Sequence, residues 1–207
     1  MTSYVAFLRA VNVGGNNKVP MAKLREALTD AGMEEVATVL QSGNVVFRSR
    51  KSSAAVAKVV AGAIEDAFGL KIGVVIRSAA ELTALAAHNP FLEGGDDDRD
   101  PKTLHVAVLS ARPTAAAVAK LDPDRSPPDA FAVHGREVYL SYPSGSGRTK
   151  LTLDYLEKTL GVTGTARNWR TVQRLAAMVE GPASGSSLAP SAANTGPARS
   201  AAHTGPA

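Results

Sequence analysis

The segment best suited to bind a ligand is a loop rich in glycine and asparagine near the N-terminus. It spans residues 10–20 and contains Asn12, Gly14, Gly15 and Asn17. Glycine lets the backbone turn so that several N–H groups point at one anion, and the positive end of a following helix favours the same charge. The loop therefore predicts an anion site, although the same residue types also build ordinary strand-to-helix turns.

A basic side chain and a second polar turn are expected beside this loop. Arg9 ends the apolar segment that precedes it and can form charge-assisted hydrogen bonds. The turn Gln41-Ser42-Gly43-Asn44 presents two amide side chains. If the first predicted strand pairs with the third, Asn44 lies near Arg9. The amides of Gln41 and Asn44 can contact a ligand beside the loop, although the same residues also make an ordinary hairpin turn. Ser42 lacks the flanking pattern of a nucleophile elbow, so it is not predicted to be a nucleophile.

Two later segments add candidate site residues. His88 ends a predicted helix, where it can act as a general acid or base, donate to phosphate, or simply complement the helix dipole. Arg167 lies at the start of the last predicted helix and can join an anion site, and Asn168 is a favourable N-cap. The four histidines lack the spacing of metal ligands and cysteine is absent, so no metal site is predicted, and no particular cofactor is indicated.

Composition sets broad limits on the class of protein. The chain has 207 residues, 44% hydrophobic residues and a net charge of +4, which suits one large or two small soluble domains and argues against a histone-like binder. No apolar run is long enough to span a membrane and no signal peptide is evident, so we expect a cytoplasmic protein. The absence of cysteine excludes disulfides and thiol catalysis.

Hydrophobic periodicity predicts an α+β fold in which one element order, β-α-β-β-α-β, occurs twice. The first round comprises strands over residues 4–9, 36–41, 44–48 and 72–76 and helices over 20–31 and 53–68. The second comprises strands over 104–109, 130–133, 137–142 and 163–166 and helices over 113–121 and 151–160. Further helices are predicted over 78–87 and 168–179, and two-residue turns at Ser42-Gly43 and Gly135-Arg136. This order is typical of ferredoxin-like units.

The predicted domain organisation follows from these elements. Residues 1–78 form the first ferredoxin-like repeat, and residues 102–180 form the second together with the last helix. A linker helix and an acidic loop occupy residues 79–101. Residues 181–207 consist mostly of Ala, Gly, Pro, Ser and Thr, with too little apolar surface to offset the entropy of ordering, so this tail is predicted to be disordered.

Several separated motifs resemble a bacterial family known as domain of unknown function 1697. The resemblance covers about residues 2–175, and the family usually has glycine where this chain has Ala10. It implies a two-repeat fold of ferredoxin-like type and no established activity. The motifs are Leu8–Asn17 with Met21 and Leu24, Gln41–Phe47, His88–Phe91 and Arg167–Val172. The positions that match the polar signature of the family are Arg9, Asn12, Asn17, Gln41, Asn44, His88 and Asn168.

These residues favour one function and leave others open. Amides and basic groups without a carboxylate pair or a thiol suit recognition better than bond breaking, so the leading hypothesis is binding of a small anionic, phosphorylated ligand. A second is RNA binding through residues 148–174, which hold six Lys or Arg against two Asp or Glu, although only 5% of residues are aromatic. A third is an enzyme with His88 as acid or base and Arg9 or Arg167 as oxyanion contact. A structural or partner-binding role and the oligomeric state stay open.

Overall fold

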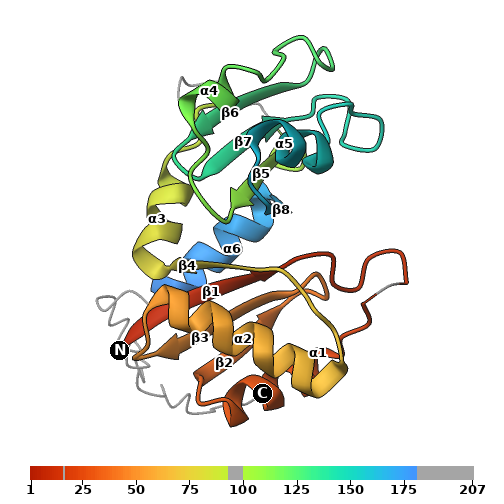
Figure 1. The fold of residues 1–207 in the computed structure, drawn as a ribbon. Helices are drawn as coiled ribbons and strands as arrows, with labels where there is room; N and C mark the ends of the chain where they lie inside the picture. Colours follow the sequence, from red (N-terminus) through yellow and green to blue (C-terminus); the bar gives the residue numbers. More distant parts are fainter. Residues whose placement is uncertain (16, 93–99, 181–207) are drawn as a thin grey trace, which may run out of the picture.

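The computed structural model describes residues 1–15, 17–92 and 100–180, which form two halves stacked on one another (Figure 1). The first half contains β1 (Thr2–Leu8), α1 (Met21–Asp30), β2 (Glu34–Val39), β3 (Asn44–Ser49), α2 (Ser53–Phe68) and β4 (Val74–Ser78). The second contains β5 (Leu104–Leu109), α4 (Ala115–Val118), β6 (Ala130–His134), β7 (Glu137–Ser141), α5 (Leu153–Leu160) and β8 (Gly164–Asn168). Helices α3 (Ala79–Ala87) and α6 (Trp169–Glu180) each follow the last strand of a half. The predicted tail, and most of the predicted acidic loop, lie outside the described residues.

Each half is built on one four-stranded antiparallel sheet, which confirms the predicted α+β class. The strand orders are β2-β3-β1-β4 and β6-β7-β5-β8. In the first sheet, β1 pairs with β3 so that Phe7 lies opposite Asn44. The expected pairing of the first strand with the third is therefore present, and it brings the hairpin between β2 and β3 to the end of β1 where the polar loop begins.

Several predicted elements differ in extent from those observed. Both β4 and β8 end two residues later than predicted, so Arg77 and Arg167 lie within strands. Helix α4 has four residues and no fully buried side chain, and only Ala117 and Val118 pack partly buried against the third core, so little apolar surface supports the longer helix predicted over 113–121. The first hairpin turn spans residues 40–43, not two residues, and its ends, Leu40 and Gly43, have positive φ. The second turn is the predicted Gly135-Arg136 pair.

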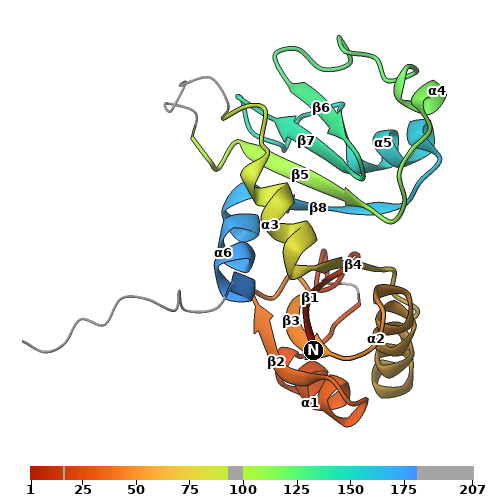
Figure 2. The same ribbon diagram turned by 90° about the vertical axis from the view of Figure 1, so that its left-hand side faces the viewer.

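Alternation along β1 shows how the two halves share a core. Ala6 and Leu8 point to a core beneath α1 and α2, whereas Val5 and Phe7 point to a central core between the two sheets. Figure 2 shows α3 and α6 side by side where the two halves meet. They supply Leu82 and Trp169 to the central core, and Trp169 is buried. A third core lies between the second sheet and α5. The two halves are thus joined by packed apolar side chains and not by a linker only.

The turn before β3 has little room for a larger residue, which gives a stability prediction. A Cβ at Gly43 would lie 2.8 Å from Leu8 Cβ and 3.2 Å from Val11 Cβ, at a φ of +72°. Gly43→Ala is expected to destabilise the fold by about 2–4 kcal/mol, since left-handed strain and overpacking add. Gly62→Ala is the control, because it lies inside α2 in open space and is expected to stabilise by about 0.5–1 kcal/mol. Urea unfolding measures both, and similar values for the two variants would contradict the prediction.

Candidate functional site

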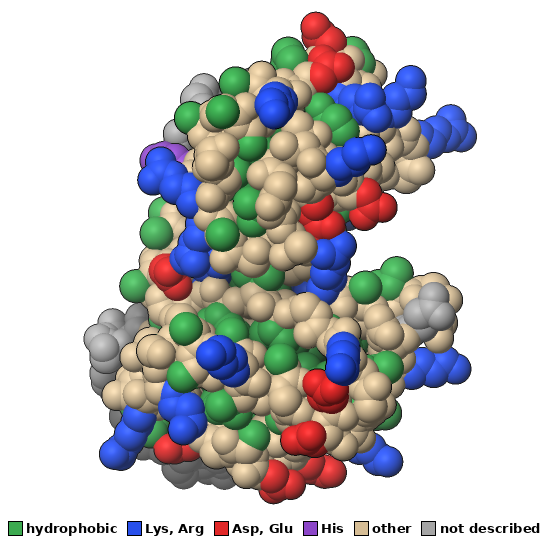
Figure 3. Space-filling view, viewed as in Figure 1, with side chains coloured by type: hydrophobic (Ala, Val, Ile, Leu, Met, Phe, Trp, Pro, Cys, Tyr) green, Lys and Arg blue, Asp and Glu red, His purple; other side chains and the backbone are tan. Residues whose placement is uncertain are grey.

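The candidate site lies in a notch that opens between the two halves. Figure 3 shows the molecule hollowed on this side, with charged side chains of both signs near the opening. The loop that connects β1 to α1 forms one lip (Figure 1). Across the notch, Arg9 at the end of β1 forms an ion pair with Glu157 of α5, with 2.5 Å between Nη2 and Oε2. Clefts between domains are common positions for small-molecule sites.

The loop itself is shaped by left-handed backbone conformations. Gly14 and Gly15 have φ of 58° and 81°, and both are exposed with open space around them. Ala10, Asn12 and Asn17 also have positive φ. Asparagine tolerates this region, but alanine is strained there by about 1–2 kcal/mol. The left-handed backbone gives a physical reason for the glycine that the family usually has at position 10.

In this structure the amides of Asn12 and Asn17 hold the loop together. The Asn12 side chain donates to the carbonyl oxygens of Val19 at 3.0 Å and Gln41 at 2.8 Å, and its Oδ1 accepts from the Val19 N–H at 2.9 Å. The Asn17 side chain donates to the Ala10 carbonyl at 3.1 Å. The Gln41 carbonyl joins the hairpin to the loop, and its side chain is exposed. Asn12 and Asn17 therefore fix the loop against the hairpin and leave the exposed backbone of the loop facing solvent.

Arg167 lies beneath this loop and is 8% exposed. Its Nε donates to Asn44 Oδ1 at 2.5 Å, and its Nη1 donates to Thr165 and to the Ala166 carbonyl. Its Nη2 donates to the Leu8 carbonyl at 2.7 Å and the Ser42 carbonyl at 3.2 Å. Every partner is neutral, and no carboxylate among the described residues lies within ion-pair distance of Arg167. Burial lowers the pKa of Arg167 to about 10, so the guanidinium stays charged at neutral pH.

The location of Arg167 corrects the sequence-based interpretation of this segment. The pattern placed it at the start of the last predicted helix. Instead it lies in β8, where the strand alternation turns its side chain inward, while Arg170 and Arg174 are exposed on α6. The basic segment considered for RNA binding therefore presents one cation fewer at its surface. Loop, hairpin and Arg167 do meet in space, with Asn44 buried between the strands.

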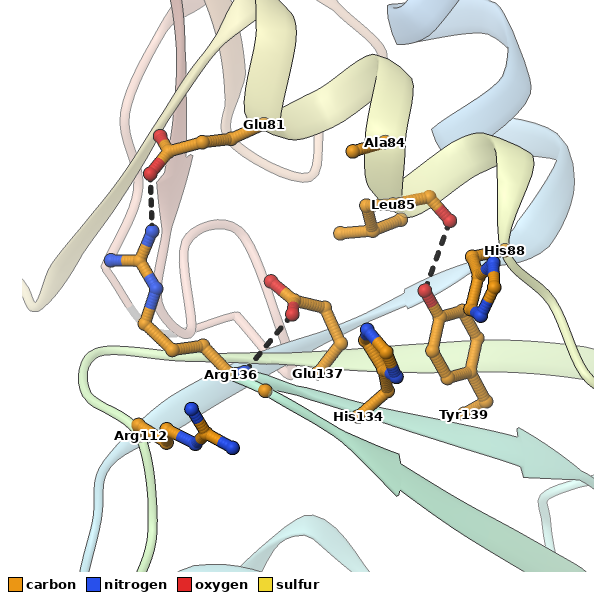
Figure 4. Close-up of a pocket in the computed structure, with 10 residues that line it drawn as sticks. Glu81, Ala84, Leu85, His88, Arg112, His134, Arg136, Glu137 and Tyr139 are labelled. Atoms are coloured by element: carbon orange, nitrogen blue, oxygen red, sulfur yellow. Dashed lines mark hydrogen bonds and ion pairs between the residues drawn. The ribbon is translucent and has the colours of Figure 1, made fainter.

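His88 lies away from this cluster, in an open pocket of about 500 Å³ between α3 and the β6–β7 hairpin. Figure 4 shows its ring beside that of His134, and the ring centroids are 4.8 Å apart. The pocket includes neither Arg9 nor Arg167 in its lining, so His88 does not share a site with the proposed oxyanion contacts. No group of three or more His, Asp or Glu able to hold a metal occurs in the part of the chain that the structure describes.

Two carboxylates in this pocket are engaged in ion pairs. Glu81 binds Arg136 at 2.5 Å and also completes the capping box of α3 with Ser78. Burial raises the pKa of Glu81, but the hydrogen bonds from Ser78 and the charges of Arg136 and Arg77 outweigh it and lower the pKa overall. Glu137 accepts from Arg77 at 3.0 Å. The first pair ties α3 to the second half and the second pair ties β4 to it, so both acids among the described residues that line the pocket are paired.

Asn168 has the capping role that its residue type predicted. Its Oδ1 accepts from the Arg170 N–H at 3.0 Å at the start of α6, and its Nδ2 donates to the Lys102 carbonyl at 2.9 Å. It lies one residue beyond Arg167 but is part of the junction between β8 and α6, not of the loop cluster. The structure thus divides the predicted residues among the notch, the His88 pocket and this junction.

Arg77 is a buried residue that the sequence reasoning missed. It is 1% exposed in β4 and donates to Glu137, to the Leu109 carbonyl at 2.8 Å and to the Arg136 carbonyl at 3.3 Å. The strand was predicted to end before it, so it was not considered. A usable signal existed, because both β4 and β8 end in arginine followed by a small polar residue and a helix.

Comparisons with known proteins agree with this fold. The conserved bacterial protein SP0830 from Streptococcus pneumoniae matches with a TM-score of 0.66 and 22% identity, over 87% of this chain and 99% of that chain. No curated protein matches the chain. No helix among the described residues is long and apolar enough to cross a membrane. A family model described as protein of unknown function (DUF1697) matches residues 1–139, which include three of the four motifs quoted above. The chain therefore belongs to the DUF1697 family.

Proposed function

We propose that the protein binds a small anionic ligand, of the phosphate-bearing class, in the notch between its halves. The observation that carries this proposal is the Arg167 guanidinium, which is 8% exposed and has no carboxylate partner among the described residues. A buried charge without a counter-ion is costly, and an anion in the adjacent notch would lower that cost. The neutral partners orient the guanidinium but do not cancel its charge.

The loop above Arg167 supports the same class of ligand. Gly14 and Gly15 are exposed and turn the backbone through left-handed conformations, which is how N–H groups are gathered around an anion. Helix α1 follows the loop with Pro20 as its N-cap, without a side-chain capping bond and without an acidic residue in its first turn. Its positive end therefore has no anionic group of its own nearby in sequence.

Two further proposals concern the fold of the two halves and the location of the protein in the cell. We propose that the two halves are ferredoxin-like repeats, because each has the order β-α-β-β-α-β and its first strand lies between its third and fourth. We also propose a cytoplasmic location, on the grounds that the sequence contains no cysteine.

The experiment is a thermal-unfolding screen of the full chain against inorganic phosphate, nucleotides, sugar phosphates, dicarboxylates, neutral sugars and short RNA. A ligand at about 100 times its dissociation constant stabilises the fold by roughly 2.7 kcal/mol, which raises the melting temperature by about 5–10 °C. Val13 is the position for a charge test, because it is an exposed loop residue. Val13→Glu places a carboxylate on the loop and is expected to weaken a phosphate ligand, and Val13→Gln has the same shape without the charge.

The outcomes separate the candidate functions. A shift with phosphorylated compounds that Val13→Glu reduces and Val13→Gln retains supports the proposal. A shift with RNA only favours the nucleic-acid alternative. A neutral ligand, or an anion that binds Val13→Glu and wild type equally, contradicts the proposed site.

A further inference from the structure

Two buried arginines occupy the same place in the two halves. Arg77 is the fourth residue of β4 and lies opposite Val5 of β1, and Arg167 is the fourth residue of β8 and lies opposite Val106 of β5. Each is followed by a polar residue whose side chain accepts from an N–H at the start of the next helix. The two halves are therefore related by an internal two-fold repetition at the level of single residues.

Each arginine reaches out of its own half into the other. Arg77 Nη2 donates to the carbonyls of Leu109 and Arg136, at the end of β5 and in the β6–β7 turn. Arg167 Nη2 donates to the carbonyls of Leu8 and Ser42, at the end of β1 and in the β2–β3 turn. Each half thus extends one arginine into the other half, where the guanidinium hydrogen-bonds to a strand end and to a hairpin.

The two arginines differ in the hydrogen-bond acceptor of their Nε–H groups. Arg77 Nε donates to the carboxylate of Glu137, at 3.0 Å, whereas Arg167 Nε donates to the amide oxygen of Asn44. Glu137 and Asn44 are the first residues of β7 and β3 and hold equivalent register positions, opposite Val108 and Phe7. The same position therefore carries a negative charge in one half and none in the other.

We infer that Asn44 is the residue that makes the notch selective for anions. Because an amide occupies the position that Glu137 holds in the second half, the charge of Arg167 is left to a ligand, while that of Arg77 is neutralised within the protein. All five N–H groups of Arg167 already have protein acceptors. The ligand therefore gains from the charge and not from a direct bond, so a neutral compound of the same shape would gain nothing. This inference rests on the proposed function and assigns its charge selectivity to one residue.

Asn44→Asp tests the inference with almost no change in size. It supplies Arg167 with a carboxylate and gives up the Asn44 donations to the Val39 carbonyl and Ser42 Oγ. Lys58→Gln is the matched control, because Lys58 is exposed on α2 and its loss lowers the net charge by the same one unit. The full chain of wild type and both variants is unfolded thermally in rising sodium phosphate, with sodium chloride holding the ionic strength constant.

The melting temperatures of wild type and Lys58→Gln are expected to rise equally with phosphate. Asn44→Asp is expected to bind phosphate at least about tenfold more weakly. An equal gain in Asn44→Asp and wild type overturns the inference and leaves the proposed function standing. If phosphate does not change the melting temperature of wild type, this result counts against the proposed function. The inference is then decided in low salt, where Asn44→Asp is expected to melt at least about 3 °C above Lys58→Gln because it pairs a buried charge. An equal or lower melting temperature overturns it.

Discussion

Arg167→Met is expected to destabilise the protein by about 3 kcal/mol. The substitution keeps much of the side-chain volume but removes the donors for the Leu8 carbonyl, the Ser42 carbonyl and Asn44 Oδ1. Each buried acceptor left without a partner costs about 1–3 kcal/mol, and removal of a desolvated charge offsets only part of that. Urea unfolding of the full chain, monitored through the buried Trp169, measures the loss.

Arg170→Met is the control for this prediction. Arg170 lies three residues further along the chain, its side chain is 55% exposed, and its ion pair with Asp100 is 3.8 Å long. A surface pair of this kind contributes little, so the change is expected to stay within about 0.5 kcal/mol of wild type. If both variants lost the same stability, the hydrogen bonds of Arg167 would not be what joins the two halves.

Arg77→Met is expected to have the largest effect, a loss of about 3–5 kcal/mol. It removes the same kind of hydrogen bonds to the other half and also leaves the Glu137 carboxylate, whose side chain is 14% exposed, without its cation. An uncompensated buried charge is more costly than unpaired carbonyls, which is why this variant is expected to be less stable than Arg167→Met. The same urea titration measures it.

The double variant Arg77→Met with Glu137→Gln separates the charge from the hydrogen bonds. A neutral amide at position 137 no longer needs the cation, so the double variant is expected to recover more than half of the loss. Recovery below that level would assign the effect to the bonds that Arg77 makes with the Leu109 and Arg136 carbonyls. Either way the comparison measures what the charge of Glu137 contributes to the fold.

Local signals were enough to predict most of the elements. Helix α2 has the predicted bounds because Ser52 caps its start, Gly69 takes a left-handed φ at its end, and three apolar side chains recur on one face. Strand β5 also has its predicted bounds. The ends of β4 and β8 were misplaced because each is followed directly by a helix, so no turn residue marks the boundary and a polar arginine stands where an apolar residue was expected.

The site was predictable in its location but not in the roles of its residues. Strand pairing placed Asn44 at the end of β1, and the loop and Arg167 did meet there. The partners of each side chain lie far along the chain, since Arg9 and Glu157 are 148 residues apart and Arg167 and Leu8 are 159 apart. Local pattern contains no information on such pairs. It therefore could not show that Asn12 holds the loop, or that the Arg167 donors are already occupied.

The central core has a consequence for the order in which this protein can fold during synthesis. Val5 and Phe7 on the inner face of the first sheet pack with Trp169, Val172 and Leu175, which the ribosome adds after all the strands of both sheets. A nascent chain that ends before α6 can close the core beneath α1 and α2 but still exposes an apolar sheet face to solvent or to a chaperone. Completion of the first half therefore waits for the synthesis of α6, and truncation before residue 169 is expected to yield an aggregation-prone product, not a stable smaller domain.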